Sequence, residues 1–251
     1  MMANDLFTYT MRLADDAAIL SQRLAGWCGH ASHLEEDIAL TNIALDQIGC
    51  ARLLYAYAGE IEGKGRDEDA LCFNRNEREF TNLLLLEQPN DDFAYAIVRQ
   101  FFYSAYVLLF WQALKSSKDE RLAGIAAKAE KEAAYHLRHS AEWVVRLGDG
   151  TEESRSRIEE AIEFLWMYTG EMFEMDEVAT ALAEQGIAVD AAAIKPAWNK
   201  SINEVFARAD LSVPTGTWMQ TGGRNGEHSE HLGHVLAPMQ YLQRAYPGLV
   251  W

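Results

Sequence analysis

The chain has 251 residues, of which 49% are apolar and 24% are charged, and its formal net charge at pH 7 is −16. A chain of this length and composition can bury a sizeable core as one globular unit. The excess of acidic residues argues against nucleic acid as a partner, because contacts with phosphates need clustered Lys and Arg. We therefore expect a single domain over residues 1–251 that binds neither DNA nor RNA.

The first residues lack the pattern of an export signal. Asp5, Asp15 and Asp16 lie where a signal peptide would have a basic start and an apolar stretch. The three cysteines have no Cys-x-x-Cys spacing, so the sequence predicts neither a disulfide framework nor a thiolate metal site. We expect a protein of the reducing cytoplasm.

Only five prolines occur, and long proline-free blocks rich in Ala, Leu and Glu predict an almost entirely helical chain. Glycine-rich stretches predict loops at residues 59–71 and 212–226, and an irregular or helical turn is expected at 75–80. The expected helices, in chain order, lie at about residues 6–27, 33–59, 81–88, 91–116, 119–147, 152–173, 176–184, 191–209 and 227–246.

Two apolar patterns refine these predictions. In the second helix, apolar residues recur with helical periodicity, at Ile38, Ile43, Leu45, Ile48 and Leu53. The longest strongly apolar run, residues 103–111, is shorter than the ~18 residues needed to span a bilayer. We therefore expect no membrane helix.

Several of the expected helices exceed ~20 residues and are joined by short or modest connections, which is typical of an antiparallel bundle. No fixed-period repeat indicates a solenoid. The predicted fold class is all-α, a ferritin-like four-helix bundle with additional shorter helices.

Such bundles hold two bridged irons with one carboxylate from each of two helices and a Glu-x-x-His pair from each of the other two. None of the seven histidines has an acidic residue three positions before it. In the stretch EKEAAYHLRHS, Glu132 precedes His136 by four positions, and His139 follows. The helix at 33–59 offers Glu36 and Asp46, and its one histidine is His33 at the very start.

We interpret Glu36, Asp46, Glu132 and His136 as polar residues near the bundle centre that do not complete a ligand set. The sequence thus predicts no metal ligand and no catalytic residue in this chain. A buried acid is costly unless it is paired, so we expect Glu132 and His136 to form a buried or half-buried pair. The candidate counter-charges lie within long predicted helices, at Arg23, Arg52 and Arg99.

A second group of histidines follows the glycine-rich stretch TGGRNG, at His228, His231 and His234. Each step of three turns a helical side chain by about −60°, so all three cannot share one metal. We predict a capped C-terminal helix here, with Glu227 near its positive end.

The chain resembles a known family over residues 6–251. The resemblance rests on four stretches: SQRLAGWCGHASHLEEDIALTNIALDQIGCARLLYAYAGE, NEREFTNLLLLEQPNDDFAYAIVRQFF, KEAAYHLRHS and TGGRNGEHSEHLGHVLAPMQYLQRAYPG. They are similar to the C subunits of bacterial phenylacetyl-CoA epoxidases, also called phenylacetate-CoA oxygenases. This family implies a ferritin-like structural subunit that is related to the catalytic A subunit but lacks its iron ligands.

The resemblance also implies partners and a reaction. The partners would be the iron-containing catalytic A subunit, a small B subunit and, transiently, a flavin and iron–sulfur reductase. The complex would use oxygen to epoxidise the aromatic ring of phenylacetyl-CoA in aerobic phenylacetate breakdown. No cofactor would be held by this chain itself.

Two hypotheses remain open from the sequence. A non-catalytic scaffold would carry a larger exposed apolar patch than a monomer usually has, and in isolation it could pair with a second copy. Alternatively, the chain is itself an oxygenase or oxidase, with an atypical iron site built from Glu36, Asp46, Glu132, His136 and His139.

Overall fold

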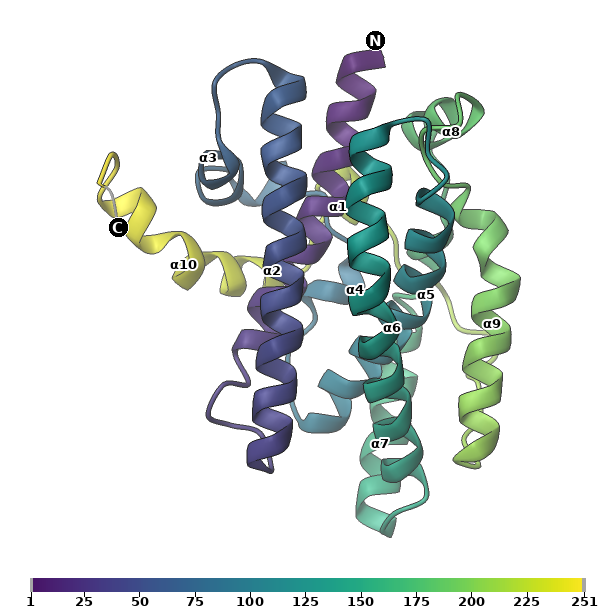
Figure 1. Cartoon of the computed structure of the whole chain (residues 1–251). Coiled ribbons are helices and arrows are strands. Elements are labelled where there is room, and N and C mark those ends of the chain that lie inside the picture. The colour runs from purple at the N-terminus through teal and green to yellow at the C-terminus, as the bar shows by residue number, and fades with distance from the viewer. Residues whose placement is uncertain (1, 250–251) are drawn as a thin grey trace. The chain divides into compact units, whose positions relative to one another are not determined.

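The computed structural model of the chain describes residues 2–249 (Figure 1). In these residues it has ten α-helices, three short 3-10 helices and no strand, which confirms the predicted all-α class. The chain divides into two compact units. The first takes the residues up to Pro89 and those from Gly222 onward, and the second takes Asn90–Thr221. The single domain predicted over residues 1–251 stays a prediction.

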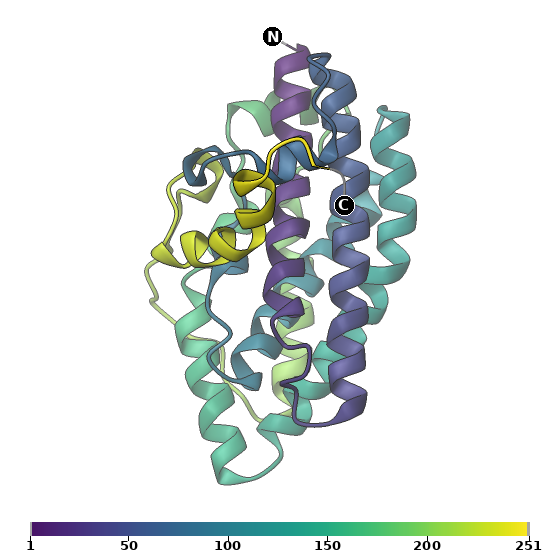
Figure 2. The same ribbon diagram turned by 90° about the vertical axis from the view of Figure 1, so that its left-hand side faces the viewer.

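The first unit is built on two long antiparallel helices, α1 and α2, which run side by side in both views (Figure 1, Figure 2). Shorter elements follow α2, and α10 returns from the C-terminal part of the chain to contact α1, α3, α4 and η1. The bounds are α1 Met2–Ala25, α2 Leu34–Glu62, α3 Glu68–Phe73, η1 Glu77–Glu79, α4 Leu84–Glu87, η3 Gly223–Asn225 and α10 Glu230–Ala245.

The second unit is built around α5, which packs on α6, α7 and α9. Aromatic rings fill its core: Phe102 lies 5.5 Å from Trp166 and 6.1 Å from Trp198 between ring centroids, and Trp198 Nε1 donates to Phe102 O at 3.0 Å. The bounds are α5 Phe93–Leu114, α6 Glu120–Gly148, α7 Glu152–Trp166, η2 Gly170–Phe173, α8 Glu177–Glu184 and α9 Ala191–Arg208.

Six helices begin after a side chain that caps them. In each case an Asp or Thr oxygen accepts a hydrogen bond from the backbone N–H three residues later, which satisfies one of the unpaired donors of the first turn. This explains why five of these helix starts lie close to the predicted ones, whereas α3, which Asp67 caps, lies in a predicted loop. The caps are Asp67, Asp92, Asp119, Thr151, Asp176 and Asp190.

Two predicted elements differ from the structure, and a glycine contact accompanies each difference. Residues 59–71 are not a continuous loop, because α2 extends to Glu62 and α3 begins at Glu68. A Cβ at Gly59 would overlap Arg66 O, so glycine lets the chain fold back closely on α2. The helix predicted at 152–173 ends at Trp166, and Gly170 then begins a 3-10 turn packed against Met219.

The most apolar 18-residue window of α5 has a mean hydropathy of 1.4, enough by length and composition to cross a membrane. The apolar segment is thus longer than the run predicted at 103–111. However, 78% of this window is buried inside the structure, as is typical of a core helix.

Candidate functional site

The four residues predicted near a bundle centre lie on two helices. Glu36 and Asp46 are half-buried on α2, and His136 is fully buried on α6. Glu132 has a side chain that is 23% exposed, and Lys128 Nζ lies 3.5 Å from its carboxylate, one turn earlier on α6. A lysine on the same helix therefore supplies a counter-charge that the sequence analysis did not consider.

The three arginines proposed as counter-charges have other described partners. Arg23 Nε donates to Glu87 O at 3.0 Å and its Nη2 donates to His231 O at 3.2 Å. Arg52 lies 3.1 Å from Glu68 and is 75% exposed, and Arg99 Nη2 donates to Asn90 Oδ1 at 2.6 Å. Their assignment to Glu132 stays a prediction.

The donor set does not fit a carboxylate-bridged di-iron centre. Such a centre takes four carboxylates and two histidines from its bundle. Glu36 and Asp46 are ten residues apart on one helix, or about 15 Å along its axis, so one centre can take only one of them. With Glu132, His136 and even His139 added, the set is still short of two carboxylates. Among residues 2–249, no three His, Cys, Asp or Glu side chains converge so as to hold a metal ion.

The first unit contains instead a network of buried charges that the sequence analysis missed. Asp15 and Asp16 on α1 and Glu87 on α4 have almost no exposed surface. Each carboxylate faces one cationic side chain, and the acid–base pairs are Asp15–Arg75, Asp16–Arg224 and Glu87–His228.

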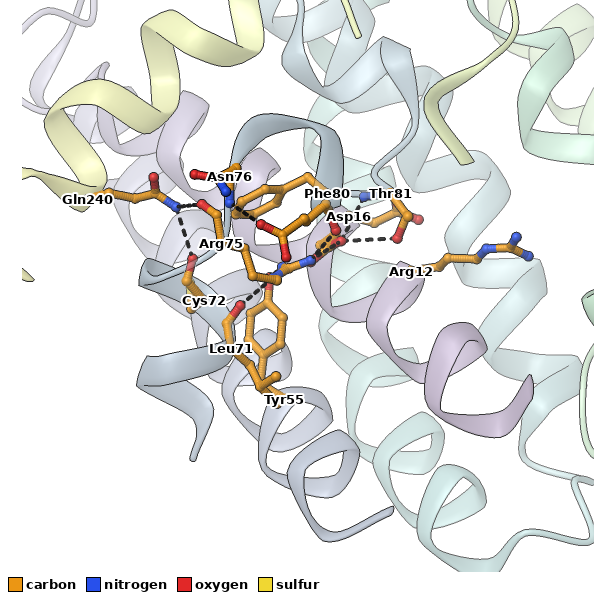
Figure 3. Close-up of polar contacts among 12 residues, drawn as sticks. Arg12, Asp16, Tyr55, Leu71, Cys72, Arg75, Asn76, Phe80, Thr81 and Gln240 are labelled. Atoms are coloured by element: carbon orange, nitrogen blue, oxygen red, sulfur yellow. Dashed lines mark hydrogen bonds and ion pairs between the residues drawn. The ribbon is translucent and has the colours of Figure 1, made fainter. Parts of the chain in front are cut away.

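Asp15 is held by α2 and by the segment that follows α3, through Tyr55, Arg75 and Thr81, which are labelled in Figure 3. Its carboxylate forms an ion pair with Arg75 and accepts from Tyr55 Oη at 2.6 Å, Thr81 N at 2.8 Å and Thr81 Oγ1 at 3.0 Å. The Arg75 guanidinium also lies over the Phe80 ring, 4.0 Å from its centroid. Burial, and then the Asp15 carboxylate, raise the pKa of Tyr55 well above its usual value, so the phenol keeps its proton and donates.

Asp16 is held by the glycine-rich segment TGGRNG. Arg224 Nη1 and Nη2 approach its two oxygens at 2.9 and 2.8 Å, and Leu83 N donates to Oδ1 at 2.8 Å. A Cβ at Gly226 would overlap Arg78 O, so a glycine is needed where the segment crosses the chain. Burial raises the pKa of Asp16 to about 6 although Arg224 lowers it, so the ion pair is intact at neutral pH. The segment is thus explained by an internal ion pair.

Glu87 binds the residues just before α10. Its Oε1 accepts from Ser229 N and Oγ, both at 2.7 Å, and its Oε2 accepts from Asn82 Nδ2 at 2.9 Å. His228 Nδ1 lies 2.8 Å from Oε2, and His228 Nε2 lies 2.8 Å from Phe80 O. A carbonyl oxygen can only accept, so Nε2 carries a proton, and a second proton lies between Nδ1 and Glu87 Oε2.

The electrostatics agree with an imidazolium at His228. Burial lowers the pKa of this histidine, but the hydrogen bond and charge of Glu87, together with the bond to Phe80 O, raise it more, so the net shift is upward from 6.5. The C-terminal helix begins at Glu230 and not at residue 227 as predicted, so His228 lies before it. Glu227, expected near the positive end of that helix, also precedes it.

In this network the negative and positive charges are equal in number, and the carboxylate oxygens are all hydrogen-bonded within the protein. Three carboxylates meet three cations, and every carboxylate oxygen accepts at least one hydrogen bond, which is what makes buried charges tolerable. It joins α1, α2, the segment 75–88 and the C-terminal segment. We interpret it as a structural lock, since its acids are already used by protein donors. One sequence feature could have indicated this network: Asp15 and Asp16 lie next to each other in the otherwise mostly apolar stretch MRLADDAAIL.

The buried ion pair can be tested by a double-mutant cycle at Asp16 and Arg224. Arg224→Met leaves a buried carboxylate without its cation, so we expect the free energy of unfolding in urea to fall by about 3–5 kcal/mol. Asp16→Asn combined with Arg224→Met should recover much of this loss. As a control, Arg157→Ala removes an exposed pair with Glu153 and should cost less than about 1 kcal/mol. An equal effect of both arginine substitutions would contradict the lock.

The pair of His228 and Glu87 makes stability depend on pH. Because the pKa of His228 is higher in the folded than in the unfolded state, its contribution is complete below about pH 6.5 and is lost as pH rises through the folded value. The difference in melting temperature between wild type and His228→Gln should therefore be largest near pH 6 and shrink toward pH 9. As a control, His234→Gln replaces an exposed histidine and should change the melting temperature little.

Comparison with known proteins agrees with the resemblance seen in the sequence. The chain is 50% identical to the C subunit of the 1,2-phenylacetyl-CoA epoxidase of Escherichia coli strain K12, over 248 residues that cover 99% of this chain and 100% of the relative. A family model described as phenylacetic acid catabolic protein matches residues 1–251. The family has a ferritin-like helical fold, which confirms the predicted fold class. The chain therefore belongs to the family of phenylacetic acid catabolic proteins.

Proposed function

We propose that this chain is the non-catalytic structural subunit of a complex that epoxidises the aromatic ring of phenylacetyl-CoA in aerobic phenylacetate degradation. The observation that carries the proposal is a donor set that falls short of a di-iron centre, in a chain that matches an epoxidase subunit over 99% of its length. The catalytic partner subunit would hold the iron, and this chain would hold no cofactor.

The stoichiometry of the reaction explains why several partners are needed. Inserting one atom of dioxygen into the ring reduces the other atom to water, which consumes two electrons and two protons. These electrons have to come from a reductase, which would bind transiently in the cytoplasm, and a small B subunit would complete the complex. The task of this chain is then to bind and stabilise the folded catalytic subunit, because a ligand specific for the folded state stabilises it by mass action.

Metal content separates this proposal from an oxygenase with its own iron. We expect the purified chain to contain no stoichiometric iron and to turn over no phenylacetyl-CoA when supplied with iron, reductase and oxygen. Adding the catalytic subunit should restore turnover and raise the melting temperature of that subunit. About two irons per chain, together with turnover by the chain alone, would instead support the site at Glu36, Asp46, Glu132, His136 and His139.

Substitutions on α6 give a second test. His136 is fully buried, so His136→Ala should lower the free energy of unfolding by about 1–3 kcal/mol. Glu132 is partly exposed beside Lys128, so Glu132→Ala should cost less than about 1 kcal/mol. Turnover of the reconstituted complex, measured per folded complex, should stay near that of wild type in both. Complete loss of turnover with unchanged stability would show that these residues act in catalysis.

A further inference from the structure

Part of the solvent-facing side of α2, between Leu34 and Ile48, is apolar. Leu34, Ile38 and Leu45 are 73%, 52% and 60% exposed, and Thr41 and Ile48 beside them are half-buried. We call these five residues the α2 seam. Exposed positions of a helix in a soluble unit are usually polar, and a helix that is apolar all round is usually buried. A seam of this kind therefore indicates that something covers it.

The core of the first unit already uses the other side of the same helix. Leu40, Ile43, Leu54 and Tyr55 are buried there, with 0–1% exposed surface, and α2 packs on α1. Residues 38 and 43 differ by five positions, or about 140° around the helix, so the two sets belong to different faces. Packing against α1 accounts for one face only.

The spacing within the α2 seam points to a helix as the occupant. Leu34, Ile38, Thr41, Leu45 and Ile48 follow one another at steps of four, three, four and three residues. This is the heptad spacing with which two helices pack their side chains into each other. Four of the five side chains are aliphatic, and the threonine carries a methyl group beside its hydroxyl. The seam runs for about 21 Å along the axis at ~1.5 Å per residue, which is three to four turns of a partner helix.

Charge selects among possible partners. The α2 sequence holds six acidic residues and one arginine, so its formal charge is −5. Glu35 and Asp46 lie on one flank of the seam, where charged residues decide partner choice between paired helices. A second copy of this chain, with a net charge of −16, would place like charges beside each other. A partner helix with an apolar stripe flanked by Lys and Arg would complement the seam.

We propose that the α2 seam is the docking surface for an apolar helix of the catalytic subunit, flanked on that subunit by basic residues. This inference rests on the proposed function, since it names the surface through which a structural subunit would hold its partner. It assigns the contact to the outer face of α2 rather than to the exposed aromatic residues Tyr241, on α10, and Tyr246, just after that helix.

The test measures binding between the full chain and the catalytic subunit. Ile38→Glu combined with Leu45→Glu puts two charges into the seam, and we expect the dissociation constant to rise at least tenfold. Because both positions are exposed, the melting temperature of the isolated chain should not change. The matched control, Tyr241→Glu combined with Leu242→Glu, alters residues of similar exposure, 62% and 47%, on α10 and should bind like wild type.

Each outcome has one meaning. If wild type binds the catalytic subunit and the seam variant binds equally well, the seam is not the docking surface, although the proposed function stands. If wild type does not bind at all, the proposed function itself fails. A lower melting temperature of the isolated variant would show that the chain covers the seam itself. A wild-type homodimer that the variant dissociates would identify a second copy as the occupant. Both results would overturn the inference.

A charge substitution tests the chemistry of the partner. Glu35→Lys at the edge of the seam should slow association with the catalytic subunit and weaken its dependence on salt, because an attraction to basic residues is removed. Faster association after this substitution would indicate an acidic partner and would contradict the proposal.

Discussion

Burial of three carboxylates is the constraint on which the first unit depends. An acid without access to water must be neutralised or hydrogen-bonded, and Asp15, Asp16 and Glu87 meet this demand with Arg75, Arg224 and His228. The cations come from segments far apart in the chain, so the unit can satisfy its acids only when the C-terminal segment returns to α1 and α4. The need to neutralise these acids thus places Arg224 and His228, and the segment that carries them, against α1 and α4.

The same hydrogen bonds and ion pairs determine whether these carboxylates are available to bind a metal ion. Ferritin-like oxygenases keep carboxylates open toward a metal, whereas here guanidinium, imidazolium, hydroxyl and backbone donors occupy the carboxylate oxygens. The network therefore holds together the elements of the first unit that supply its charged groups.

Periodicity and capping made most helices predictable, because a helix start depends on local signals such as Asp92, Asp119 and Thr151. The break after Trp166 and the short helix α3 depend on contacts with residues distant in the sequence, so no local pattern revealed them. Family likeness and fold class were likewise readable from sequence alone.

The buried network was missed for a related reason. The two members of each acid–base pair lie between 60 and 208 residues apart in the chain, as for Arg75 with Asp15 and Arg224 with Asp16. Metal-ligand spacing favoured Glu132 and His136 instead, because an acid and a histidine one helical turn apart lie on the same face of a helix. Spacing within one helix shows which side chains share a face, but it does not show what faces them across the unit.

The apolar pattern of α2 shows a second limit of sequence reasoning. A stripe that packs in the core and a stripe that packs on another subunit obey the same chemistry, since both lose water on assembly. The five apolar residues that share the helical period, from Ile38 to Leu53, divide between a buried and an exposed face, with Ile43 inside and Leu45 outside. Only the structure separates them. A helix that satisfies its own core with one face and repeats aliphatic residues at heptad spacing on the other has the features of an element shared between two proteins.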